Sequence, residues 1–525
     1  MQPAFLRKDF VRTPSLIKHF FAFGLITIVF TASAFAFADI QQVNGDDFRS
    51  LLKEGDKLVR RGEFFEAEKI FKRAIEINPS HSGARIKLAL VHVKQRRLSE
   101  AYDLILPIAK AEPKNSNAFA ALGATLLSAG KFREARTVFE NALRLNKKEA
   151  LAWAGYGMLD FYENRILSSL SSLHEAVFQA SNEPDYYFAL AQVSARGERY
   201  KEAADAYYRF LSLSRNTDDE RRARIRGLIN FLRFLGQKQT LYTTGGQAET
   251  SVPIRIVGNR PVIELRINDR ARPLKFVLDT GSGICVISDK TAKQLGIKPI
   301  TRGGFAKGIG GNGRFEIVYG FLKEVEIGDV GIRNVPVYIR KFHSDGDDID
   351  GYIGLSLISK FLTTIDYGAL TFSLTKTDSD ASRMDVGVSL PLRLTSSGFL
   401  SGEVHLEGID EPLNFIVDTG ATVSVISDGV ANSAAINSFV RSEKMRVVGS
   451  AGITDNVQSF LLPRVSFGTH SRKSITAIAL DLGTINEASG FEQAGILGGN
   501  FLRNYRMTFD FKNSKVTFVA ITQEQ

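Results

Sequence analysis

The stretches LDTGS at residues 278–282 and VDTGA at residues 417–421 decide the fold of this chain. Each follows an apolar run that is typical of a buried strand, and each precedes a second apolar run. A single Asp-Thr-Gly would be interpreted as an Asx-turn between two strands, because Asp and Gly are common turn residues. The second copy favours a functional site, since a carboxylate at the end of a buried strand loses solvent and its pKa can be tuned.

The duplication extends beyond these turns. IGLSLI at residues 353–358 and LGGNFL at residues 497–502 occupy the same place in each half, and an Asp between apolar and aromatic residues follows each at the same spacing. Short runs of alternating apolar and polar residues surround them, as expected of half-buried strands. We therefore predict two copies of one mostly-β unit, lobe 1 at residues 252–377 and lobe 2 at residues 388–523.

Together these motifs resemble those of the aspartic peptidases, specifically the retropepsin-like group, with two lobes in one chain as in pepsin-like enzymes. The resemblance covers about half of the chain and implies that Asp279 and Asp418 face each other as the catalytic pair. The residues that would support them in the two turns are Thr280, Gly281, Ser282, Thr419 and Gly420. The family pattern implies that the two threonines interlock the turns and that Ser282 hydrogen-bonds the first aspartate. Ala421, the counterpart of Ser282, has no hydroxyl, so we expect the two carboxylates to differ in environment.

A glycine-rich stretch, GIGGNG at residues 308–313, lies between the two motifs of lobe 1. It satisfies the GxGxxG pattern, but a dinucleotide site needs a helix that begins at those glycines, and residues 314–319 alternate as a strand. The stretch resembles the flap tip of retropepsins, which would consist of Gly308, Ile309, Gly310 and Gly311. A plain hairpin turn is the alternative. In lobe 2, residues 448–453 suit either a second flap or a plain turn.

Two carboxylates at hydrogen-bonding distance cannot both ionise cheaply, so the pair is expected to hold one shared proton. Such a pair would activate water to attack a peptide carbonyl, with no covalent intermediate and no cofactor. No metal is expected, because the chain has one cysteine and its seven histidines lack HExxH spacing. The acidic stretch 343–350 lacks EF-hand spacing, which favours a solvated loop over a calcium site.

The N-terminus has the pattern of a targeting segment. Residues 1–19 are basic, and residues 20–38 are uncharged and end in Ala-Phe-Ala. The pattern predicts a secretory signal peptide at residues 1–38 that is cleaved after Ala38. A signal anchor is the alternative, because the uncharged run is about long enough to span a membrane. Both place the rest of the chain outside the cytoplasm, as a periplasmic, secreted or membrane-anchored protein.

Residues 48–236 have a helical pattern that repeats with a period of about 34 residues and resembles a tetratricopeptide array. Small and aromatic residues recur two periods apart: Gly55, Ala67, Phe71 and Ala74 return as Gly123, Ala135, Phe139 and Ala142. Stacking of such repeats buries faces that one repeat cannot bury alone. A helix at about 217–236 is expected to cap the array, and residues 237–251 are expected to be a polar linker. From this linker we expect residues 252–525 to fold without the repeats.

The predicted fold class is an all-α tetratricopeptide-type solenoid followed by a mostly-β bilobal aspartic-peptidase fold. The net charge of +10 does not indicate a nucleic-acid partner, because the densest basic run, residues 221–226, is expected to be a solvated helix face. The predicted function is that of an exported aspartic endopeptidase that acts on proteins or peptides, with the repeats recruiting substrate or partner proteins. A non-catalytic peptide-binding or scaffold protein on the same fold is the alternative.

Overall fold

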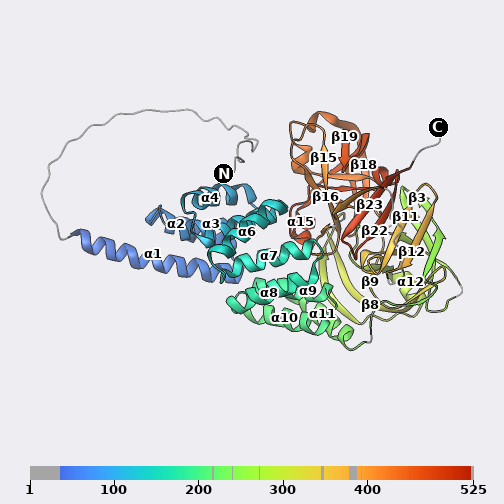
Figure 1. Ribbon diagram of the computed structural model, residues 1–525, viewed down its shortest axis with the longest axis horizontal. Helices are drawn as coiled ribbons and strands as arrows, with labels where there is room; N and C mark the ends of the chain where they lie inside the picture. Colours follow the sequence, from blue (N-terminus) through green and yellow to red (C-terminus); the bar gives the residue numbers. More distant parts are fainter. Residues whose placement is uncertain are drawn as a thin grey trace. The chain divides into compact units, whose positions relative to one another are not determined.

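The computed structural model describes residues 36–215, 218–238, 240–270, 272–311, 313–343, 348–377, 387–391 and 393–521 (Figure 1). The chain divides into two units, Met1–Arg49 and Ser50–Gln525. Of the first unit, only the start of helix α1 (Ala36–Arg61) is described, so nearly all of the signal or anchor expected at residues 1–38 lies outside the described residues. Within the ranges given above, no helix is long and apolar enough to cross a membrane.

The predicted helical solenoid is confirmed. Its helices follow α1 in chain order: α2 (Phe64–Ile77), α3 (Ser82–Lys94), α4 (Leu98–Ala111), α5 (Ser116–Ser128), α6 (Phe132–Leu145), α7 (Ala150–Tyr162), α8 (Ile166–Gln179), α9 (Pro184–Arg196), α10 (Tyr200–Leu213) and α11 (Asp219–Gly236). The recurring small residues allow close helix packing. A Cβ at Gly123 of α5 would overlap the ring of Phe139 on α6, and Gly55 of α1 faces Phe71 of α2 in the same way.

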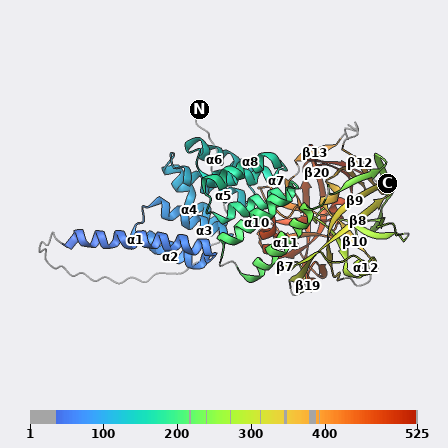
Figure 2. The ribbon, with the colours of Figure 1, turned by 90° about the horizontal axis from the view of Figure 1, so that it is seen from below.

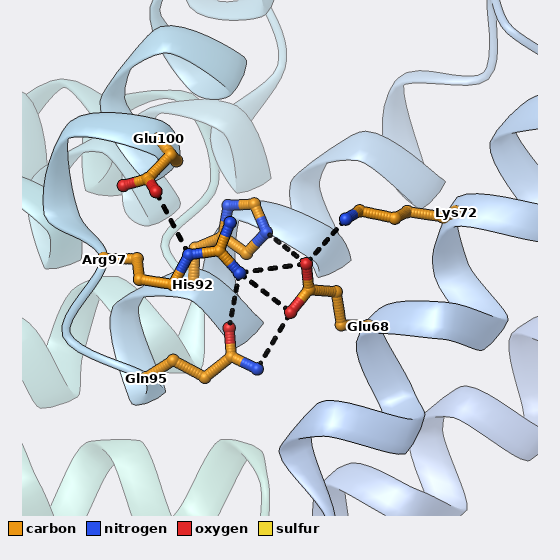
Figure 3. Close-up of polar contacts among 6 residues, drawn as sticks. All are labelled: Glu68, Lys72, His92, Gln95, Arg97 and Glu100. Atoms are coloured by element: carbon orange, nitrogen blue, oxygen red, sulfur yellow. Dashed lines mark hydrogen bonds and ion pairs between the residues drawn. The ribbon is translucent and has the colours of Figure 1, made fainter.

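Glu68 of α2 is the centre of a polar cluster that joins α2, α3 and α4 (Figure 3). Its carboxylate accepts hydrogen bonds from Gln95 Nε2 at 3.0 Å and from Arg97 Nη1 at 2.9 Å, and it pairs with Lys72 Nζ at 2.7 Å. Burial alone would raise the pKa of Glu68, but these donors outweigh burial and lower the pKa to about 2. The ionised carboxylate therefore stabilises the contact between the first two helix pairs.

Lobe 1 is built from twelve strands in the described part of the chain. They are β1 (Thr243–Gly246), β2 (Glu249–Pro253), β3 (Arg255–Val257), β4 (Arg260–Ile267), β5 (Leu274–Leu278), β6 (Cys285–Ser288), β7 (Thr301–Lys307), β8 (Arg314–Ile327), β9 (Val330–Arg340), β10 (Gly351–Ile353), β11 (Phe361–Asp366) and β12 (Thr371–Lys376), with short helices α12 (Asp289–Gln294) and α13 (Leu355–Ile358). Among described residues, the main sheet has the order β1-β9-β6-β10-β5-β4-β8-β7, with β3 beside β4.

Lobe 2 repeats this plan. Its strands are β13 (Val388–Pro391), β14 (Arg393–Leu394), β15 (Leu400–Leu406), β16 (Leu413–Val417), β17 (Ser424–Ser427), β18 (Val440–Gly449), β19 (Gly452–Phe467), β20 (His470–Leu480), β21 (Gly495–Leu497), β22 (Tyr505–Asp510) and β23 (Lys515–Ala520), with short helices α14 (Asp428–Ala431), α15 (Gly483–Ser489) and α16 (Gly499–Leu502). In both lobes, the strand before the Asp-Thr-Gly turn pairs in parallel with the strand of the apolar-apolar-Gly motif: β5 with β10 and β16 with β21.

A shared sheet joins the two lobes. Its order is β13-β23-β22-β11-β12-β2 in the described part of the chain, so β11 of lobe 1 pairs directly with β22 of lobe 2. Ile365 of β11 lies opposite Met507 of β22, and both are fully buried. One hydrophobic core therefore runs through both lobes.

The segment 237–251 is not the polar linker that we expected. It contains β1, which pairs with β9, and most of β2, which pairs with β12. Leu241 is 5% exposed and joins the core of the lobes together with Phe231 and Leu235 of α11. The polar composition misled the prediction, because β2 exposes every second residue and β1, at the edge of its sheet, is exposed along most of its length.

The repeat array also packs against lobe 2. Phe491 is fully buried, and its ring lies edge-on at 4.9 Å from the rings of Phe132 and Tyr162. Arg196 of α9 lies over the Phe161 ring at 3.7 Å and donates to the Ser396 carbonyl at 3.2 Å. These contacts, like those of α11 with lobe 1, remove the basis for expecting residues 252–525 to fold without the repeats.

Candidate active site

The two Asp-Thr-Gly turns meet where β5 and β16 end. Asp279 follows the fully buried Leu278, and its N–H donates to the Ile353 carbonyl of β10 at 2.9 Å. In lobe 2, the N–H of Asp418 donates to the Leu497 carbonyl of β21 at 3.0 Å. The apolar-apolar-Gly motifs therefore hold the backbone of each aspartate in place.

Thr280 and Thr419 interlock the turns. The Thr280 hydroxyl donates to the Val417 carbonyl at 2.7 Å, and the Thr419 hydroxyl donates to the Leu278 carbonyl at 2.7 Å. Each hydroxyl also accepts the backbone N–H of the other threonine at 3.1 Å. Both threonines are completely buried, so these four hydrogen bonds are shielded from water.

The glycines of the turns bring the two carboxyl groups together. A Cβ at Gly281 would overlap the carboxyl group of Asp418, and a Cβ at Gly420 would stand 2.7 Å from Asp279 Oδ1. The turns also supply donors: Gly281 N–H lies 3.0 Å from Asp279 Oδ1, and Gly420 N–H lies 2.7 Å from Asp418 Oδ1. The two carboxyl groups therefore lie next to each other, since a Cβ at Gly420 would also stand 3.1 Å from Asp418 Oδ1. Six predicted residues thus lie together: Asp279, Thr280, Gly281, Asp418, Thr419 and Gly420.

The environment raises the pKa of both aspartates. Burial raises the pKa of Asp279 well above its ordinary value, and the neighbouring carboxyl of Asp418 raises it further. Burial also raises the pKa of Asp418, although the N–H groups of Gly420 and Ala421 oppose this. Both residues are half-buried, so the pair keeps some contact with solvent. The pair can hold one proton that belongs to both groups.

Ser282 does not have the role that the resemblance implied. Its hydroxyl donates to the Ile284 carbonyl at 2.9 Å instead of to Asp279. The two carboxylates still differ, as expected, but for another reason. Asp279 Oδ1 accepts one backbone N–H, whereas Asp418 Oδ1 accepts two, the second from Ala421 at 3.1 Å. The difference therefore comes from a backbone donor of the lobe 2 turn, and not from the Ser282 hydroxyl of lobe 1.

The glycine-rich stretch forms the turn of the β7–β8 hairpin. Gly310 and Gly311 have φ angles of 88° and 55°, which favour glycine. The tip touches the lobe 2 turn between β18 and β19: Ile309 N–H donates to Ser450 Oγ at 3.2 Å, and the Ile309 carbonyl accepts the Ala451 N–H at 2.8 Å. Residues 448–453 form the turn of the β18–β19 hairpin, so both lobes contribute a hairpin and the two tips meet. This geometry suits both a second flap and a plain turn.

Arg340 is a residue that the sequence did not single out. It ends β9, its guanidinium lies over the Phe315 ring of β8 at 4.9 Å, and its buried Nε has no hydrogen-bond partner among the described residues. Its positive charge lowers the pKa of Asp279. No local pattern signals this residue, because the contact depends on how β8, β9 and the Asp279 turn come together. No cluster of His, Cys, Asp and Glu that could hold a metal ion occurs in the described part of the chain.

The fold and this site define a two-lobed aspartyl protease region that follows a repeat array. Residues 263–357 and 402–501 match the family model described as "Aspartyl protease", one segment in each lobe. The model covers both Asp-Thr-Gly turns and both apolar-apolar-Gly motifs. The chain therefore contains an aspartyl protease region of this family.

Tetratricopeptide models match residues 58–125, 121–159 and 157–219, so the array consists of tetratricopeptide repeats. The chain is 33% identical over 93 residues to an inactive TPR repeat-containing thioredoxin of Arabidopsis thaliana, which is 18% of this chain and 14% of the relative. It is 24% identical over 167 residues to a BBSome complex member homolog of Drosophila melanogaster, which is 30% of this chain and 34% of that relative. The chain thus spans at most about a third of these two relatives.

Solved structures of repeat proteins are similar to the array. A thermophilic TPR protein of Thermus thermophilus is 22% identical, with a TM-score of 0.30 over 35% of this chain and 98% of that one. PilF of Pseudomonas aeruginosa is 16% identical, with a TM-score of 0.28 over 37% of this chain and 86% of that one.

Proposed function

We propose that this protein is a retropepsin-like aspartic endopeptidase in which Asp279 and Asp418 are the catalytic pair and residues 308–311 are a flap. The observation that supports this most strongly is the adjacent carboxyl pair, supplied by two duplicated turns and held by the Thr280 and Thr419 interlock. A carboxyl pair with raised pKa values that is still open to solvent suits general acid and base chemistry on water.

The chemistry follows from the single shared proton. The ionised carboxylate accepts a proton from a water molecule, and the oxygen of that water attacks the scissile peptide carbonyl. The protonated carboxyl group donates a hydrogen bond to the oxygen that becomes negative. A proton then passes to the leaving nitrogen, the C–N bond breaks, and the pair again holds one proton.

The repeats are proposed to recruit protein substrates or partner proteins. Tetratricopeptide arrays expose extended concave surfaces that suit this role. We also propose that residues 1–38 export the chain, so that the peptidase acts outside the cytoplasm. N-terminal sequencing of the mature protein should begin at Asp39. An intact N-terminus in the membrane fraction would indicate an anchor, and a chain that stays in the cytoplasm would contradict export.

The proposed activity is tested by incubating the purified protein with a diverse peptide mixture at several pH values and identifying new termini by mass spectrometry. Asp279→Asn and Asp418→Asn should each abolish cleavage, and the double variant should be no worse than either, because the two groups act as one unit. Retained activity in a single variant would show that the turns do not share one site. Peptide binding without cleavage in the wild type would favour the non-catalytic alternative.

Thermal stability reports on the pair independently of cleavage. The folded-state pKa of Asp279 lies well above the unfolded value of about 3.8, so ionisation destabilises the fold as pH rises through the folded pKa. Asn cannot ionise. The melting temperature of Asp279→Asn relative to the wild type should therefore rise from pH 4 to neutral pH. A difference that is constant with pH would contradict the raised pKa.

A further inference from the structure

Helix α11, the last helix of the repeat array, lies against β7, the first strand of the β7–β8 hairpin (Figure 2). The contact is made by backbone. A Cβ at Gly227 of α11 would stand only 2.5 Å from the Arg302 carbonyl oxygen and from the Gly303 Cα. Such a separation is far shorter than a normal van der Waals contact, so this helix and strand approach as closely as they do because residue 227 is glycine.

Polar contacts extend the interface toward the flap tip. Arg224 Nη1 donates to the Phe305 carbonyl of β7 at 3.0 Å. Glu220, one turn earlier on α11, pairs with Arg314 Nη2 of β8 at 2.6 Å. The Arg314 guanidinium also lies over the Phe305 ring at 5.0 Å. Both strands of the hairpin are thus attached to the first half of α11.

Aromatic contacts hold the base of the hairpin to the second half of the helix. The Phe231 ring stacks on Tyr319 of β8 with centroids 4.5 Å apart, and each residue is 3% exposed. Phe234 meets Phe321 edge-on at 5.4 Å. The helix therefore follows the hairpin from its apolar base at Phe321 to Phe305, close to the tip.

The tip is held differently. Its contacts with lobe 2 are hydrogen bonds between glycine-rich turns: those of Ile309 with Ser450 and Ala451, and one from Gly311 N–H to the Ile453 carbonyl at 3.1 Å. The Ile309 side chain also packs on an apolar cluster of lobe 2. Movement of the lobe 1 hairpin away from lobe 2 would break these tip contacts, whereas movement away from the repeat array would break its contacts with α11.

We propose that α11 is the fixed support of the lobe 1 flap: the contact between α11 and β7 stays closed while the contact between the two hairpin tips opens to admit a peptide. Gly227 and Arg224 are then positioning residues for the flap, and the repeat array is a working part of the peptidase. The inference rests on the proposed function, because it assigns an entry route to that site.

Two engineered disulfides test the proposal. Ala223→Cys with Gly304→Cys closes the α11 contact, since a Cβ at Gly304 would lie 3.5 Å from the Ala223 Cβ. Gly308→Cys with Ser450→Cys closes the tip, because a Cβ at Gly308 would overlap Ser450 Oγ. The native Cys285 is 2% exposed and burial raises its pKa to about 11, so it does not take part in thiol–disulfide exchange with the engineered cysteines. Each variant is compared with its own reduced form, which cancels the effect of the substitutions.

The expected result is that the oxidised tip variant loses cleavage of the peptide mixture and regains it on reduction, whereas the oxidised α11 variant keeps its cleavage rate. Loss of cleavage in the oxidised α11 variant would overturn the proposal, and so would full cleavage by the oxidised tip variant.

A matched pair of substitutions tests the positioning role. A Cβ at Gly236, in the same helix, would meet the Tyr200 Cβ at an ordinary 3.6 Å. Gly227→Ala should therefore lower kcat/KM by roughly tenfold to a hundredfold through displacement of the flap. Gly236→Ala should leave it nearly unchanged, and equal effects of the two would contradict the role of Gly227.

Amide hydrogen exchange tests this inference independently of the proposed activity, because the measurement does not depend on peptide cleavage. In the wild type, the amides of Ile309, Gly311 and Ala451 should exchange faster than the paired amides of β7. Gly227→Ala should speed exchange in β7, and Gly236→Ala should not. If the wild type cleaves no peptide, the proposed function is refuted. The hydrogen-exchange rates then still test whether α11 holds the flap. Protected tip amides with fast exchange in β7 would overturn it.

Discussion

Thr280→Val should destabilise the protein far more than an ordinary threonine substitution. Valine keeps the shape of the side chain but removes the hydroxyl, which leaves the Val417 carbonyl without its donor and the Thr419 N–H without its acceptor. Each buried polar group left unpaired costs about 1–3 kcal/mol, so the free energy of unfolding should fall by roughly 2–6 kcal/mol. That is a large part of a typical domain stability of about 5–15 kcal/mol.

The matched control is Thr364→Val in the sheet that joins the lobes. Its hydroxyl bonds to the Thr508 hydroxyl at 3.1 Å in a partly buried position, so the loss should stay near 1 kcal/mol. Urea unfolding followed by circular dichroism measures both variants. If Thr280→Val were no more destabilising than Thr364→Val, the interlock would not be what holds the two turns together.

Three further predictions follow from the same structure. Arg340→Met removes the positive charge that lowers the pKa of Asp279, so the pH profile of kcat/KM should move to higher pH; an unmoved profile would show that Arg340 does not act on the pair. Glu68→Gln should destabilise the protein above about pH 4.5, and the deficit should shrink toward pH 2, because the folded-state pKa is lowered from 4.5 to about 2; equal melting temperatures at neutral pH would contradict this. A fragment of residues 252–525 should be poorly soluble, because it lacks α11 and β1, and a soluble fragment with a cooperative melt would refute the shared core.

The repeat array and the two lobes could be predicted from the sequence because their signals are local and repeated. The two Asp-Thr-Gly turns, the apolar-apolar-Gly motifs and the period of the repeats each depend on residues close together in the chain. Their spacing also predicted that the carboxyl groups meet, since paired copies of one unit place equivalent turns at a common interface.

The features that could not be predicted from the sequence mostly depend on contacts between segments that are far apart in the chain. Ser282 donates to its near neighbour Ile284, a choice of hydroxyl rotamer that no motif encodes. The strands β1 and β2 are short, and most of their residues are polar or glycine, so only their pairing with β9 and β12 distinguishes them from a linker. Gly227 is one glycine in a long helix, and only its position against β7 explains it.

The two lobes are equivalent at the threonine interlock but not around it. In lobe 1, β6 pairs in parallel with β9, so that Ser288 faces Arg340; in lobe 2, β17 pairs with β20 in the same register, so that Ser427 faces Leu480. A cation in lobe 1 thus stands where lobe 2 has an apolar side chain, which packs in the same cluster as Ile309. Because the charge of Arg340 acts on Asp279, the symmetry of the duplicated turns is broken at the carboxyl pair itself. A site made by two identical lobes from two chains would have to place the same group on both sides. The shared sheet through β11 and β22 and the interlocked threonines likewise pair the two lobes within one chain.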